Sequence, residues 1–132
     1  PYRRQRQMCI RAGYIPDVDI YYRDASILCL TSTFEGWPLC LTEAQANGVI
    51  PISFNCCAGI EAILGPNKVN GILVPNGDIN AFAKELTELI NNPQLMEEIR
   101  KNVLKKVLTY SPELVGEKWL NLFNTLLENS NN

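Results

Sequence analysis

The sequence has 132 residues, 46% hydrophobic and 20% charged, with no histidine and a net charge of -2 at pH 7. These values are typical of one globular domain and exclude disordered, collagen-like and multi-domain chains. The slight excess of acids argues against binding to nucleic acid through its phosphates. No apolar run approaches the roughly 18 residues that a membrane span needs, so we expect no transmembrane segment.

The absence of histidine narrows the chemistry that the chain can perform. Catalytic Ser–His and Cys–His pairs cannot form within it, so carboxylates must act in any catalysis unless a base comes from elsewhere. The five cysteines are an odd number without CxxC spacing, which favours reduced, buried thiols in a cytosolic protein. Cys29 and Cys40 lie in apolar stretches. A reactive Cys56 or Cys57, in an expected loop, is the less favoured interpretation.

The first half of the chain alternates short apolar runs with helical segments, as in the βα units of a parallel sheet. The chain begins without methionine, and we interpret the basic residues Arg3, Arg4 and Arg6 as one face of a truncated helix rather than an anion site. Strands are expected at Cys9 to Ala12, Ile27 to Leu30, Val49 to Phe54 and Ile72 to Val74. Helices are expected at Val18 to Asp24, Pro38 to Asn47 and Ile60 to Leu64. Because the strands are almost entirely apolar, helices should cover both faces of the sheet.

The second half is predicted to be all helical. From Asp78 onward, apolar residues recur at intervals of three and four, which predicts one helix to Ile90 and a second from Pro93 to Val107. Ser111 and Pro112 are typical of a third helix start, and that helix should end near Glu128. Its apolar stripe consists of Trp119, Leu122, Phe123 and Leu126. One interpretation is that this stripe contacts a further part of the protein. The favoured one is that at least two of these four side chains pack on the core of this chain.

Candidate ligand-binding residues concentrate after the second expected strand. Thr31 and Ser32 follow that strand, and a helix start shortly afterwards offers free N–H groups that attract phosphate. Glu35 is placed beside this anion site, where sugar hydroxyls are suitable donors to it. Glu43 is eight residues further on, within an unusually apolar stretch, and we expect it to be an internal, ligand-facing acid. The alternative is a solvated loop acid followed by an ordinary helix-surface acid.

A family resemblance covers most of the chain, from about residue 13 to residue 127. The segments that carry it are 21–26, Leu30-Thr31-Ser32, Glu35-Gly36-Trp37-Pro38-Leu39, Glu43-Ala44, 48–52, 70–75 with Gly77-Asp78, and 119–127. Together they resemble the C-terminal domain of the retaining GT-B glycosyltransferases of family 4, which carry two glutamates separated by seven residues. The resemblance implies an α/β, Rossmann-like parallel sheet with helices on both faces. Residues 1–132 would be a truncated nucleotide-sugar-binding domain whose N-terminal acceptor domain is absent.

The function implied by the resemblance is transfer of a sugar from a UDP- or GDP-linked donor with retention of configuration. The acceptor would be a glycan or lipid-linked sugar in surface polysaccharide biosynthesis, with the enzyme in the cytoplasm, at the inner face of the membrane through its missing domain. No cofactor is implied. The fragment alone is expected to be inactive, because half a cleft neither positions the substrates nor excludes water.

The resemblance also implies roles for individual residues. Glu35 would bind the hydroxyls of the donor sugar and is the catalytic candidate, and Glu43 would hold the ribose. The amides of Gly36, Trp37 and Leu39 would face the sugar and the diphosphate. Thr31 and Ser32 would line the floor of the pocket. Two other functions stay open: a non-catalytic nucleotide-binding or scaffold domain, and a GT-B-like sugar-nucleotide epimerase.

A possible metal motif is interpreted differently. Asp17-Val18-Asp19 has the DxD pattern by which another class of glycosyltransferases holds a divalent cation. Here the pair precedes a predicted helix, where a cap and a first-turn acid belong. We therefore expect no metal site.

Overall fold

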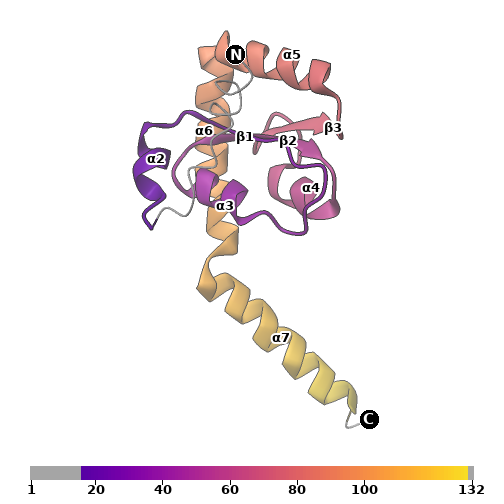
Figure 1. The fold of residues 1–132 in the computed structure, drawn as a ribbon. Helices are drawn as coiled ribbons and strands as arrows, with labels where there is room; N and C mark the ends of the chain where they lie inside the picture. The colour runs from indigo at the N-terminus through magenta and orange to yellow at the C-terminus, as the bar shows by residue number, and fades with distance from the viewer. Residues whose placement is uncertain (1–15, 131–132) are drawn as a thin grey trace.

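The computed structural model describes residues 16–130, which form a three-layer α/β/α body with one projecting helix (Figure 1). The sheet has three parallel strands in the order β1 (Ile27–Leu30), β2 (Ile50–Asn55) and β3 (Ile72–Pro75). Helix α2 (Asp19–Asp24) precedes β1, α3 (Leu39–Ala46) joins β1 to β2, and α4 (Ala58–Leu64) joins β2 to β3. The α/β prediction is confirmed. The strand expected at Cys9 to Ala12 and the basic residues before it lie outside the described residues.

Helices cover both faces of the sheet, as predicted. Ile27 pairs with Ile50, and Ile52 pairs with Ile72. Paired residues of neighbouring strands point to the same face, and successive residues of one strand point to opposite faces. One face packs against α5 (Ile79–Ile90) and α6 (Pro93–Val107), and the core there contains Ile50, Ile52, Phe54, Ile72, Val74, Phe82, Leu89, Ile99 and Val103. The other face packs against α3 and α4, with Leu28, Leu30 and Leu73 beside Leu41, Ile60, Ile63 and Leu64.

The expected helix ends are confirmed by their hydrogen bonds. Asp78 Oδ1 accepts from the Ala81 amide at 2.9 Å, and Ser111 Oγ accepts from the Leu114 amide at 3.3 Å. Gly48 has φ 69°, the left-handed conformation that ends α3. The start of α5, the start of the helix at Pro112 and the end of α3 thus follow from local signals in the sequence.

Strand β1 lies at an edge of the described sheet. Its residues are half-buried or exposed, whereas five of the six residues of β2 are buried. The expectation of a buried Cys29 is therefore wrong for the described part of the chain: this cysteine is exposed, because an edge strand has a neighbour on one side only. Cys40, Cys56 and Cys57 are half-buried, and these three and Cys29 are free thiols.

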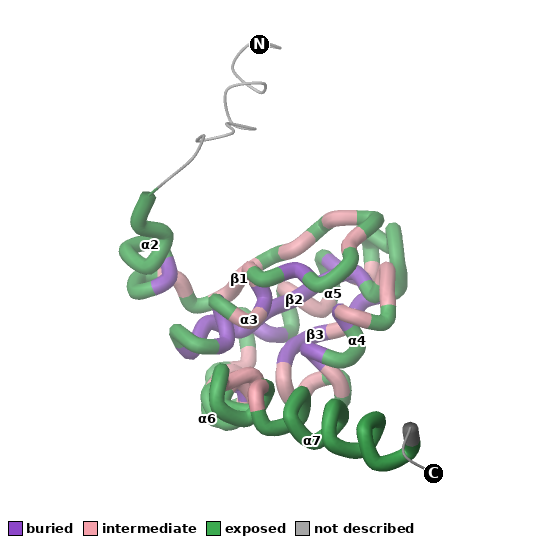
Figure 2. Tube along the Cα trace, turned by 90° about the horizontal axis from the view of Figure 1, so that it is seen from below, coloured by how far each residue is buried: buried purple, intermediate pink, exposed green. Residues whose placement is uncertain are grey.

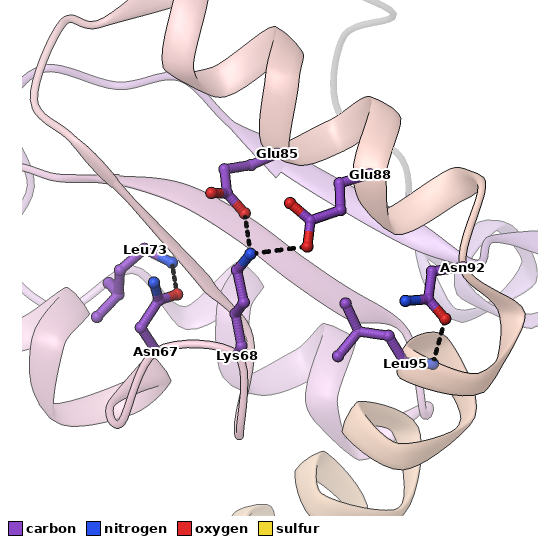
Figure 3. A network of polar contacts seen from close by, with 7 residues as sticks. All are labelled: Asn67, Lys68, Leu73, Glu85, Glu88, Asn92 and Leu95. Carbon is purple, nitrogen blue, oxygen red and sulfur yellow. Dashed lines mark hydrogen bonds and ion pairs between the residues drawn. The ribbon is translucent and has the colours of Figure 1, made fainter.

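The segment between α4 and β3 is fastened to helices on both sides of the sheet. Lys68 Nζ lies 3.0 Å from Glu85 Oε2 and 3.0 Å from Glu88 Oε1, both on α5 (Figure 3). On the opposite side, the buried side chain of Gln45 on α3 donates from Nε2 to the carbonyl oxygens of Ile63 at 3.3 Å and Asn70 at 2.9 Å. The segment consequently links the two helical layers.

The last helix projects away from the body. After a short 3-10 turn, η1 (Leu108–Tyr110), helix α7 (Pro112–Ser130) continues outward, and Figure 2 shows it exposed along nearly all of its described length. The exposed fractions of Trp119, Leu122, Phe123 and Leu126 are 55%, 47%, 52% and 56%. The expectation that at least two of them pack on the core is wrong, because the helix leaves the body where it begins. Among residues 16–130, no helix has the length and hydropathy to cross a bilayer.

Candidate functional site

The loop after β1 lies at the carboxyl edge of the parallel sheet, where α/β proteins bind ligands. A groove of about 550 Å³ opens beside it. The walls include Thr31 and Thr33 from the loop, Phe54 from β2, and Gly77, Ile79 and Phe82 from the start of α5 and the turn before it. Ser32 is half-buried in the same loop. The structure therefore places the predicted floor residue Thr31 in a groove, and the walls of that groove are mainly apolar.

Glu35 and Glu43 both lie near Cys40, in the first turn of α3. Burial raises the pKa of the Cys40 thiol, and the negative charges of Glu35 and Glu43 raise it further. Glu35 belongs to the loop before α3 and Glu43 to the second turn of the helix, so the two carboxylates approach Cys40 from different positions. Glu35 is half-buried there, beside the sheet edge.

Glu43 is exposed, so the expectation of an internal acid is wrong for the described part of the chain. Helix α3 turns Leu41, Ala44 and Gln45 inward, and the apolar neighbours of Glu43 in the sequence cover other sides of the helix. The carboxylate instead faces α2, where the Tyr22 hydroxyl lies 3.3 Å from Glu43 Oε2 and 3.3 Å from the Cys40 carbonyl oxygen.

Tyr22 is a site residue that sequence reasoning missed. Burial, followed by the charge of Glu43, raises the pKa of Tyr22 to about 12. The available signal was its spacing from Val18 and Ala25, which places Tyr22 on the inward face of a helix. Its phenol supports the outer side of α3 and contacts the carboxylate predicted to bind ribose.

The Gly36–Trp37 turn packs against α4 and η1. The Cys57 thiol donates to the Gly36 carbonyl oxygen at 3.4 Å. The Trp37 ring meets the Tyr110 ring edge-on, with 5.6 Å between centroids and 83° between planes, and the Tyr110 hydroxyl donates to the Ala62 carbonyl oxygen at 3.2 Å. Helix α4 starts at Ala58, two residues before the predicted Ile60, and Gly59 in its first turn lies directly against the Gly36 carbonyl.

The backbone of this turn has free donors. Within residues 16–130, the amides of Gly36, Trp37 and Leu39 donate to no backbone or side-chain acceptor. The Trp37 and Leu39 side chains are 46% and 65% exposed, so this part of the loop faces outward. Free amides at the start of a helix suit an anion, which is the role predicted for these three residues.

The DxD pair has a structural role at the start of α2. Asp17 Oδ1 accepts from the Asp19 amide at 3.2 Å, and Asp19 is the first-turn acid of the helix. Across residues 16–130, no cluster of three or more Cys, Asp or Glu side chains has the geometry to hold a metal ion.

Comparison with known proteins shows close similarity over most of the chain. Residues 3–106 match the sequence model of a family described as Glycosyl transferases group 1. An uncharacterized glycosyltransferase of Haemophilus influenzae is 37% identical over 110 residues, which cover 81% of this chain and 31% of the relative. The poly(ribitol-phosphate) alpha-N-acetylglucosaminyltransferase of Staphylococcus aureus is 34% identical over 117 residues, covering 86% of this chain and 23% of that protein.

Solved structures show the same similarity. A variant of S. aureus TarM, crystallised with fondaparinux, alpha-GlcNAc-glycerol and UDP, superposes with a TM-score of 0.75 at 32% identity, over 86% of this chain and 23% of that one. The chain thus spans less than a third of the length of each of these relatives.

Proposed function

Because the chain belongs to the group 1 glycosyltransferases, with residues 3–106 matching that family, we propose that it is the donor-binding domain of a sugar-transferring enzyme. The enzyme would transfer a sugar from a nucleotide-diphosphate donor to an acceptor with retention of configuration. A polymeric acceptor accords with the poly(ribitol-phosphate), a polyol phosphate, in the name of the S. aureus relative. The free thiols accord with a cytoplasmic site of reaction.

The observation that carries this proposal is the group of free amides in the loop that leads into α3, next to the half-buried Glu35. The unpaired amides of Gly36 and Trp37 follow Glu35 in this loop, and Glu43 lies in the second turn of α3, beside the Tyr22 hydroxyl. A carboxylate beside an anion site needs hydroxyl donors, which a sugar and a ribose supply. The amides and the positive end of α3 would hold the diphosphate.

Glu35, the loop amides and Glu43 would each bind a different part of the donor. Glu35, half-buried, would accept hydrogen bonds from donor-sugar hydroxyls and orient the anomeric carbon. The amides of Gly36, Trp37 and Leu39 would stabilise negative charge as it develops on the leaving diphosphate, a term that usually dominates such catalysis. Glu43 would hold the ribose from the side of α3 that faces Tyr22.

The test is donor binding and transfer by the full-length gene product. We expect UDP or GDP to bind in titration calorimetry, and a sugar nucleotide with the matching base to be consumed. Glu35→Gln should reduce turnover by far more than it reduces nucleotide affinity, because Glu35 contacts the sugar. Failure of the wild-type protein to bind either nucleotide would contradict the proposal.

A non-catalytic nucleotide-binding domain is the second candidate, and the exposure of Glu43 favours it. A domain that only binds a nucleotide makes and breaks no bond, so it needs no closed, water-excluded cleft around its carboxylates. The same experiment separates the two functions: binding of UDP or GDP without transfer to any acceptor would support the binding domain.

A further inference from the structure

The first turn of α4 lies directly against the peptide group that joins Gly36 to Trp37. A β-carbon added to Gly59 would overlap the Gly36 carbonyl oxygen, and it would also lie 3.3 Å from the Gly36 carbonyl carbon and 3.5 Å from Trp37 Cε3. Residue 59 therefore has to be glycine for the loop to occupy this position. The Cys57 thiol donates to the same oxygen at 3.4 Å. Gly59 therefore leaves room for the Gly36 carbonyl, and Cys57 holds it by a hydrogen bond.

The Trp37 side of this short turn is linked to α4 as well, through Tyr110. Trp37 packs edge-on against Tyr110, whose hydroxyl donates to the Ala62 carbonyl of α4. Gly36 itself has open space around its α-carbon, with nothing within 4 Å of an added β-carbon. The contacts of the Gly36–Trp37 peptide group are thus concentrated on its carbonyl side.

Fixing this carbonyl also fixes an amide. A trans peptide group is planar, and its C=O and N–H bonds point in opposite directions. The one cis bond among residues 16–130 is Gly65–Pro66, so the Gly36–Trp37 bond is trans. With the Gly36 carbonyl held toward α4, the Trp37 N–H points away from α4, and it has no acceptor in the described part of the chain.

We propose that Cys57 and Gly59 are positioning residues that aim the Trp37 N–H at the diphosphate of the donor. This inference rests on the proposed function and deepens it, since it assigns the orientation of one phosphate-binding amide to a second segment, after β2. In Gly59→Ala, the methyl group displaces the Gly36 carbonyl and rotates the peptide group. The Trp37 N–H bond then no longer points at the diphosphate, although the amino acids of the loop are unchanged.

The test compares nucleotides with and without phosphates, using the full-length protein. We expect Gly59→Ala to weaken UDP or GDP binding by about tenfold, the effect of one lost hydrogen bond to a charged group. Affinity for the corresponding nucleoside should stay the same. Cys57→Ala should weaken diphosphate binding by about threefold, because a thiol is a weak donor, and Cys57→Ser should restore it. Gly116→Ala and Cys29→Ala are matched controls at an open helix position and an exposed thiol.

The outcomes are distinguishable from one another. If the wild-type protein binds UDP or GDP and Gly59→Ala binds it equally well, the positioning role is wrong and the proposed function stands. Equal losses for the nucleotide and the nucleoside would mean general damage to the site and would also overturn the positioning role. If the wild-type protein binds neither nucleotide, the proposed function fails, and this inference fails with it.

Discussion

The hydroxyl of Tyr22 lies 3.3 Å from Oε2 of Glu43, so a phenol that is 6% exposed contacts a carboxylate that is open to solvent. The same hydroxyl reaches the Cys40 carbonyl oxygen at 3.3 Å. This contact limits the freedom of the Glu43 side chain before any ligand binds. A carboxylate that is already oriented loses less conformational entropy when it accepts hydrogen bonds from a ribose.

The buried phenol should give the protein a distinctive loss of stability in alkali. The pKa of Tyr22 is raised from 10.0 to about 12 in the folded state, so between these values the unfolded chain releases a proton that the folded chain keeps. The free energy of unfolding should therefore be independent of this group below pH 10 and should fall as the pH rises from 10 to 12. Urea unfolding at pH 9, 10 and 11 measures the effect. Tyr22→Phe should show a smaller fall, and parallel curves for the two proteins would contradict the assignment.

Removing the carboxylate of Glu43 should weaken nucleotide binding. Glu43→Ala is expected to cost about 1 to 3 kcal/mol of UDP or GDP affinity, the range for hydrogen bonds to a charged group. Titration calorimetry on the full-length protein measures this loss. Glu98→Ala, an exposed glutamate on α6, is the control for the change in net charge and should bind normally. Unchanged affinity of Glu43→Ala for both nucleotides would rule out the ribose role.

Gln45 should contribute to stability through its side-chain amide. Its Nε2 donates to the carbonyls of Ile63 and Asn70, and the Ile63 carbonyl lies at the end of α4, where no helical partner exists. Gln45→Leu keeps the volume but removes both donors, and it should lower the free energy of unfolding by about 1 to 3 kcal/mol. Denaturant unfolding measures the change. Gln94→Leu, on the exposed side of α6, should alter stability little, and equal effects of the two substitutions would contradict this role.

Transfer activity is expected to be independent of divalent cations. Asp17 and Asp19 are engaged at the start of α2, and amides at the start of α3 are proposed to stabilise the leaving diphosphate. The full-length enzyme should keep its activity in EDTA, and Asp17→Asn combined with Asp19→Asn should be active. Activity that is abolished by chelation and restored by manganese or magnesium would overturn this expectation.

Local signals in the sequence predicted the elements of the fold closely, and tertiary contacts account for the differences. Capping residues and helical spacing located α5 and α6, and apolar runs located β1 and β3 within a residue. The inward face of α3 could not be predicted, because apolar residues surround Glu43 in the sequence on every side of so short a helix. The exposure of Cys29 depends on which strands pair with β1. The role of Gly59 depends on a carbonyl 23 residues earlier in the chain.

The side chains of α7 and of the Gly36–Trp37 turn differ in how strongly they depend on the rest of the described chain. Core side chains and the Gly36–Trp37 turn must fit their neighbours, so a change at one position requires a change at another. The outward residues of α7 do not pack against the sheet, since they are exposed from its first turn onward. Substitutions on its apolar face should therefore leave the packing of the sheet and of the Gly36–Trp37 turn unchanged. Tyr110, which contacts Trp37 just before α7 begins, lies where the packed body ends and the exposed helix starts.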